Sequence, residues 1–256
     1  MKKEKTILSF DWHGVIVDSV SSMLSGVNHI LQDLDLEVLP KSFLKQNLDK
    51  STSEFLKIIR ATQNMDAKKE CQFLREFNNL MIKSSKADKK LIRVLENLPK
   101  NGFFSAVMTN KTSAELISSA HFAGIDLRLF DYIQTGDRYP YHKPSGFFFS
   151  PLLIWAHDLN ENLDSRNVLY FGDSINSDYH AIRNARMQGK KMKFVGVCSG
   201  IDTYEDFVSV GIKEQNIISD YDGVAFYLDR IAGIQELNFA NSPASSTISV
   251  FAGNRN

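Results

Sequence analysis

The stretch from Thr6 to Ser19, TILSFDWHGVIVDS, decides the fold that this sequence predicts. Its apolar run ends at Phe10 and has the length of one buried strand. Asp11 follows at once, and Gly14 comes three residues later. Ligands of an open α/β sheet bind beyond the carboxyl ends of its strands, so Asp11 lies where a catalytic carboxylate would lie. Taken alone, the same aspartate is better explained as the cap of a turn.

Composition places the chain among ordinary globular proteins. Its 256 residues are 43% hydrophobic and 23% charged. The 30 basic and 30 acidic residues balance, so net charge gives no reason to expect nucleic acid or a membrane surface as a partner. The N-terminal apolar run is too short for a signal peptide, and no stretch is long enough to cross a bilayer. Cys71 and Cys198 lack metal-ligand spacing, which predicts two buried free thiols and a cytoplasmic location.

From residue 19 to residue 86 the apolar residues follow helical spacing, and no segment has a strand pattern. Residues 19–34 are predicted to form an amphipathic helix, and a polar connector containing Pro40 follows it. The capping box Ser51-Thr52-Ser53-Glu54 begins a second helix. Asp66 begins a third, whose apolar residues are Leu74, Phe77, Leu80 and Met81. One interpretation is a helical subdomain that completes the core.

After this region, helices and strands alternate. Strands are predicted at 103–108, 132–135, 168–171, 193–197 and 217–218. Helices are predicted from Asp88 to Leu98 and at 113–123, 147–158, 179–188 and 203–210. Such alternation implies right-handed crossovers and an α/β fold, a Rossmann-like parallel sheet with helices on both faces.

Polar groups follow three of these later segments. Thr109 ends an apolar strand, and a hydroxyl with free N–H groups there suits a phosphoryl oxygen. Lys143 precedes a proline, and its ammonium could reach a phosphate and Asp11, although a solvated surface lysine would look the same. Gly172-Asp173-Ser174, with Asp178 five residues after Asp173, delivers two carboxylates to a turn, where they suit Mg²⁺.

These stretches, above all FDWHGVIVDS and GDSINSD, resemble the haloacid dehalogenase-like superfamily, whose members are mostly Mg²⁺-dependent phosphatases. The resemblance spans about residue 5 to residue 237 and includes four motifs in order. It implies an α/β core domain formed by residues 1–18 and 87–238, and a helical cap domain formed by residues 19–86. Residues 239–256, rich in Asn, Ser, Ala and Gly, are expected to be a flexible tail.

The resemblance also implies a mechanism for hydrolysis of a small phosphorylated metabolite. Asp11 would attack phosphorus and form an aspartyl-phosphate. The expected Mg²⁺ ligands are Asp11, the His13 carbonyl and Asp173, with Asp178 supporting the metal's waters directly or from behind. The groups expected to hold the transferring oxygens are Thr109, Asn110 and Lys143.

His13 stands where the family's first motif has a second aspartate, which protonates the leaving group and later activates water. Imidazole titrates near neutrality, so His13 is predicted to be the general acid and base. A nearby Mg²⁺ would lower its pKa and a bound phosphate would raise it.

Two alternative functions remain open on sequence grounds. The chain could be a catalytically weakened relative that binds a phosphorylated ligand or a partner protein. It could also be a phosphonate-cleaving hydrolase, a branch that the pair Asp11-Trp12 resembles. That branch also needs a cap lysine for a Schiff base, and the available ones are Lys41, Lys45, Lys50 and Lys57.

Overall fold

Within residues 5–48, 50–199 and 201–233, which the computed structural model describes, six parallel strands form one sheet. Their order is β3-β2-β1-β4-β5-β6, so the strand before Asp11 lies near the centre. The strands are β1 (Thr6–Phe10), β2 (Phe103–Met108), β3 (Tyr132–Gln134), β4 (Val168–Gly172), β5 (Lys193–Val197) and β6 (Ile217–Ile218).

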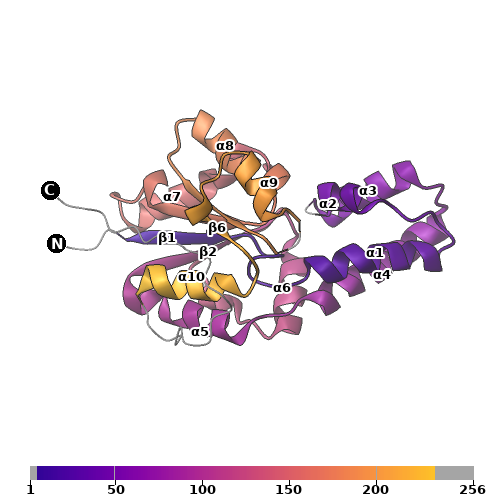
Figure 1. Ribbon diagram of the computed structural model, residues 1–256, viewed down its shortest axis with the longest axis horizontal. Coiled ribbons are helices and arrows are strands. Elements are labelled where there is room, and N and C mark those ends of the chain that lie inside the picture. Colours follow the sequence, from indigo (N-terminus) through magenta and orange to yellow (C-terminus); the bar gives the residue numbers. More distant parts are fainter. Residues whose placement is uncertain (1–4, 49, 200, 234–256) are drawn as a thin grey trace.

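Helices cover both faces of this sheet (Figure 1). Those that pack on it are α5 (Lys89–Asn97), α6 (Ser113–Ala123), α7 (Ser150–Leu159), α8 (His180–Met187), α9 (Tyr204–Ser209) and α10 (Gly223–Ala232). Leu8 and Phe10 of β1 pack with α5, α6 and α10, whereas Ile7 packs with α7, α8 and α9. The predicted fold class is therefore confirmed.

Burial of β1 on both faces explains where Asp11 lies. Ile7, Leu8 and Phe10 have no exposed surface, so the strand is fixed between β2 and β4. The Asp11 N–H then donates to the carbonyl of Phe171 at 2.9 Å, which extends the pairing by one residue. The side chain of Asp11 consequently lies at the carboxyl edge of the sheet.

Four helices form a separate layer beyond this edge (Figure 1). They are α1 (Val20–Asp33), α2 (Lys41–Asn47), α3 (Thr52–Thr62) and α4 (Ala67–Ser84), and we call them the helical unit. Phe55, Phe73 and Phe77 form its centre, and the Phe77 ring lies 5.0 Å from that of Phe55 and 5.8 Å from that of Phe73. The unit therefore has a hydrophobic core of its own.

The two connections to the helical unit lie side by side. Asp18 and Lys86 exchange backbone hydrogen bonds of 2.8 and 3.2 Å. Next to them, the Tyr221 hydroxyl donates to the carbonyl of Ile16 at 2.8 Å and accepts from the N–H of Asp88 at 3.2 Å. The chain thus leaves the sheet and returns to it at one point.

The structure corrects three details of the sequence analysis. Residues 41–47, expected as a connector, form α2, because Leu44 and Leu48 are four residues apart and both are buried. Helix α10 was not predicted at all, although four of its apolar residues face the sheet. The two cysteines, expected to be buried, are exposed (Cys71) and half-buried (Cys198). Cys71 is exposed because α4 turns Phe73 to the interior and places Cys71 on its outer side.

None of the helices in the described part of the chain is long and apolar enough to span a bilayer. The tail predicted at 239–256 lies outside the described residues.

We expect the helical unit to lose stability separately from the sheet. Phe77→Ala removes a fully buried ring and should destabilise the unit by about 3–5 kcal/mol. Hydrogen exchange should then show faster exchange in α1, α3 and α4, with unchanged protection in β1 and β4. Phe171→Ala, in the sheet, serves as the reciprocal control. Equal loss of protection in both parts would mean that they unfold as one unit.

Candidate active site

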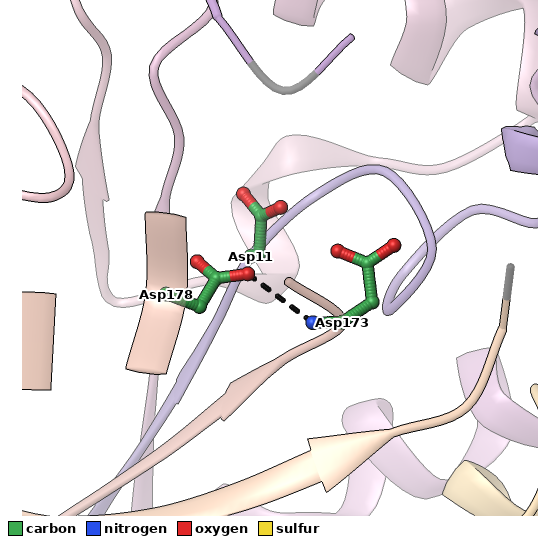
Figure 2. Close-up of side chains that lie close together, drawn as sticks. All are labelled: Asp11, Asp173 and Asp178. Carbon is green, nitrogen blue, oxygen red and sulfur yellow. Dashed lines mark hydrogen bonds between the residues drawn. The ribbon is translucent and has the colours of Figure 1, made fainter. Parts of the chain in front are cut away.

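Three aspartates converge at the carboxyl ends of the two central strands (Figure 2). Asp11 follows β1, Asp173 follows β4, and Asp178 lies in the π-helical turn Ile175–Tyr179. One carboxylate oxygen from each lies within 4.8 Å of the others, and all three side chains are buried. Because β1 and β4 are neighbours in the sheet, the topology brings together residues more than 160 positions apart.

The carboxylate of Asp178 is surrounded by hydrogen-bond donors. Its Oδ1 accepts from the Lys143 ammonium and from the Tyr170 hydroxyl, each at 2.7 Å. Its Oδ2 accepts from the N–H groups of Asp173 and Ser174, each at 3.2 Å, and the first of these is the dashed line in Figure 2. Since both oxygens are engaged, Asp178 is suited to position its neighbours and not to bind a ligand directly.

Two glycines leave room for the side chains of Asp173 and Asp178 beside the backbone. A Cβ at Gly172 would overlap the side chain of Asp178, and one at Gly14 would overlap the carboxylate of Asp173. Gly14 also has φ of 78°, a conformation that other residues rarely adopt.

Lys143 connects two of the carboxylates. Its Nζ lies 2.7 Å from oxygens of both Asp11 and Asp178. Asn110 fixes the Lys143 main chain, accepting from its N–H at 2.9 Å and donating to its carbonyl at 3.1 Å. Burial lowers the pKa of Lys143, but the two carboxylates outweigh that effect and raise it above its ordinary value. The side chain of Asn110 therefore positions Lys143, and only the main chain of Asn110 remains available to a substrate.

The single positive charge of Lys143 does not balance the three carboxylates of the cluster. Burial, together with the charge of Asp178, raises the pKa of Asp11 to about 6, although Lys143 opposes the shift. A set of oxygen donors with excess negative charge fits a hard divalent cation such as Mg²⁺. Asp11 and Asp173 are the carboxylates suited to hold it.

A cavity of about 30 Å³ adjoins this cluster. The sheet side supplies Asp11, His13, Thr109, Asn110, Lys111 and Asp173, and the helical unit supplies Val20, Met23 and Leu48. Five of the seven predicted site residues therefore line one space. The other two, Lys143 and Asp178, do not line the cavity, and Lys143 contacts both Asp11 and Asp178.

The sequence analysis missed the role of Lys111. Its ammonium donates to main-chain carbonyls of the helical unit, at 3.2 Å to Leu48 and 2.7 Å to Lys50. Nearby, the carboxylate of Glu115 in α6 accepts from the Thr52 hydroxyl in α3. The loop after β2 thus holds the helical unit against the sheet. The only signal for Lys111 in the sequence was that it directly follows Thr109 and Asn110.

His13 has an unusual environment. Its Nδ1 lies 2.8 Å from the Oγ of Ser19, which leaves Nε2 as the nitrogen available to a ligand. Burial lowers the pKa of His13 to about 3, and the charges of Lys111 and Lys143 add to the effect. The imidazole is therefore neutral at pH 7, and it does not titrate near its usual value of about 6.5.

The features that favoured a phosphonate-cleaving enzyme do not come together. Trp12 is fully buried, packs against Phe130, and donates from Nε1 to the Ser119 hydroxyl at 2.7 Å. Among the residues that line the cavity, the only lysine is Lys111, so none of the four candidate cap lysines does so.

Comparisons with known proteins identify a family and structures that this chain is similar to. The sequence model of a family described as haloacid dehalogenase-like hydrolase matches residues 8–191. No curated protein matches the sequence.

Solved structures show the same fold. A structure described as a predicted phosphoglycolate phosphatase from Haemophilus somnus 129PT has 21% identity and a TM-score of 0.64, covering 92% of this chain and 100% of its own. β-Phosphoglucomutase from Clostridium difficile has 17% identity and a TM-score of 0.62, covering 89% and 96%. A hydrolase from Pseudomonas syringae has 19% identity and a TM-score of 0.65, covering 88% and 99%.

The raised pKa of Asp11 predicts how its replacement changes stability. The folded protein, with a pKa of about 6, holds this proton more tightly than the unfolded chain, at about 3.9. Stability contributed by Asp11 is therefore lost as the pH rises between these values. Asp11→Asn should raise the free energy of unfolding above pH 6, by at most about 3 kcal/mol, and should have little effect below pH 4. Urea unfolding with a chelator present measures this.

Asp178→Asn is the matched control, because it leaves Lys143 and two N–H groups with a poorer acceptor. It should lower stability by roughly 3–5 kcal/mol at the same pH. A gain in stability for both variants would contradict the different roles given to the two aspartates.

Proposed function

The chain belongs to the haloacid dehalogenase-like hydrolase family, and from that membership we propose that it is a Mg²⁺-dependent phosphohydrolase acting on a small phosphorylated metabolite. The observation that carries the proposal is the buried carboxylate of Asp11, which lines a cavity together with Asp173 and Lys111 and lies 2.7 Å from the ammonium of Lys143.

Asp11 is the nucleophile in this proposal. Its carboxylate oxygen attacks phosphorus, the bond to the ester oxygen breaks, and an aspartyl-phosphate forms. Water then attacks the phosphorus of this intermediate and restores the carboxylate. Lys143, at 2.7 Å, keeps the carboxylate oriented and favours its ionised form.

Several groups of the cavity would hold the phosphoryl oxygens. Thr109, Asn110 and Lys111 all line it, and they would offer a hydroxyl, main-chain N–H groups and an ammonium. Thr109 Oγ1 also accepts from the Lys111 N–H at 3.2 Å, which curves the loop around this space.

The carboxylates of Asp11 and Asp173 and the His13 carbonyl would bind Mg²⁺, and Asp178 would hold Asp173 from behind. When bound, Mg²⁺ would neutralise the negative charges that otherwise keep a carboxylate from a phosphate.

His13 would transfer the protons. A neutral imidazole is a base, so it suits the activation of water in the second step. In the first step, the negative charge of a bound phosphate would raise the pKa of His13, so that the imidazole could hold a proton brought by the substrate.

The helical unit would act as a moving cap. A cavity of about 30 Å³ holds roughly two waters, so a phosphorylated substrate cannot enter the closed form. We propose that the paired connections at Asp18 and Lys86 are the hinges, and that the Lys111 and Glu115 contacts re-form on closing.

The proposal predicts Mg²⁺-dependent release of phosphate from an aryl phosphate, whose good leaving group needs little acid assistance. Asp11→Asn should lower turnover by about 10⁴-fold or more, since the amide cannot attack phosphorus. Asp126→Asn, on the exposed surface and paired with Arg128, should leave turnover unchanged. Turnover by Asp11→Asn at the rate of the unmodified protein would exclude the covalent mechanism.

The role of His13 predicts dependence on the leaving group. His13→Ala should slow hydrolysis of alkyl phosphates by roughly 10²–10⁴-fold, the range for a positioned acid or base. An aryl phosphate should be far less affected, because its oxygen leaves without a proton. Steady-state kinetics on both classes provide the measurement.

Equal slowing of both classes would show that the imidazole only positions or shields its neighbours. His13→Asp discriminates further. A large rise in alkyl phosphate hydrolysis in that variant would favour a weakened relative that chiefly binds its ligand.

A further inference from the structure

A second and larger cavity lies between the helical unit and α6. Its volume is about 460 Å³, within the range of roughly 300–1,000 Å³ of small-molecule sites. It lies between α3 and α4 on one side and α6 on the other. His13 lines this cavity as well as the smaller one beside Asp11, and no other residue lines both.

Because His13 lines both cavities, each cavity can be assigned to a different part of one substrate. The smaller cavity contains the nucleophile and the groups suited to phosphoryl oxygens. A substrate whose phosphorus lies there, and whose ester oxygen lies beside His13, would extend toward the larger cavity, because His13 lines both. The larger cavity is therefore the space for the leaving group.

The lining of the larger cavity combines apolar side chains, among them Leu56, Leu74 and Ile82, with hydroxyl groups, and it contains no lysine or arginine. The hydroxyl groups come from Ser51, Thr52, Ser53, Thr112, Ser118 and Ser119. The one acidic side chain is that of Glu115, whose oxygens accept from Thr52 and Thr112.

Two polar side chains of this cavity are available to a ligand. Asn78 of α4 and Ser118 of α6 both line it, and in the described part of the chain neither side chain has a hydrogen-bond partner. Their amide and hydroxyl groups can donate to and accept from a hydroxylated ligand. A carboxylate in the same place would be desolvated beside Glu115 without a cation to pair with it.

We propose, resting on the phosphohydrolase function above, that the leaving group is an uncharged, hydroxyl-bearing one, a small polyol or sugar, and that Asn78 determines this specificity. The cavity rejects leaving groups that carry a carboxylate.

Two matched substrates test the charge preference. Glucitol 6-phosphate and gluconate 6-phosphate differ only at C1, which is a CH₂OH group in the first and a carboxylate in the second. The protein with Mg²⁺ should hydrolyse the polyol ester with a kcat/KM at least about tenfold higher. Three outcomes overturn the inference: equal kcat/KM values for the two esters, a higher value for gluconate 6-phosphate, or only background rates for both.

An aryl phosphate, measured in parallel, separates this inference from the function on which it rests. No Mg²⁺-dependent hydrolysis of the aryl ester overturns both. Hydrolysis of the aryl ester without preference for the polyol overturns the specificity alone.

A pair of variants on one helix tests Asn78. Asn78→Lys places an ammonium in the cavity and should shift the ratio of the two kcat/KM values toward the carboxylate by about tenfold or more. Asn79→Lys adds the same charge to an exposed position of α4, and should leave the ratio unchanged. Aryl phosphate hydrolysis by each variant reports that it is folded. An unchanged ratio in Asn78→Lys, or equal shifts in both variants, overturns the role of Asn78.

If Asn78→Lys does not fold, Asn78→Asp takes its place. An added carboxylate should raise the preference for the polyol ester, and an unchanged preference overturns the role of Asn78 in the same way.

Discussion

The geometry of this site depends on one buried carboxylate, that of Asp178. Its two oxygens accept from groups on three segments: Lys143 in the loop before α7, Tyr170 in β4, and the main chain at the start of the following turn. A buried charge is tolerated only when its hydrogen bonds are this complete. The same contacts fix the loops relative to one another before a ligand arrives, which is the preorganisation that catalysis requires.

Negative charge is concentrated here at the expense of stability. Burial and Asp178 raise the pKa of Asp11, so the folded chain holds an ionised Asp11 less favourably than water does. A cation bound by Asp11 and Asp173 would offset this charge and compete with the proton, so metal affinity would depend on pH. Local rules for a stable core are commonly violated at functional sites for this reason.

The sequence predicted the features that depend on local pattern. Short apolar runs followed by an acid or a hydroxyl identified β1, β2 and β4, and with them Asp11, Thr109 and Asp173. Contacts between distant segments left no such pattern. Tyr170 looked like one more core residue, and Lys111 binds main-chain carbonyls more than 60 positions away. The lowered pKa of His13 likewise depends on burial by elements that the sequence does not place.

The hydrogen bonds between Asp18 and Lys86 also bear on how the chain folds. Strands β1 and β2 are neighbours, yet the whole helical unit separates them in the sequence. Once that unit has formed, Asp18 and Lys86 are together, and the chain that must close between the strands is reduced to roughly a quarter of its length. The entropy of closure falls by about 1 kcal/mol, since each halving of a loop saves about 0.6 kcal/mol. The folded helical unit therefore shortens the loop between β1 and β2, and this makes the pairing of these two central strands easier to nucleate.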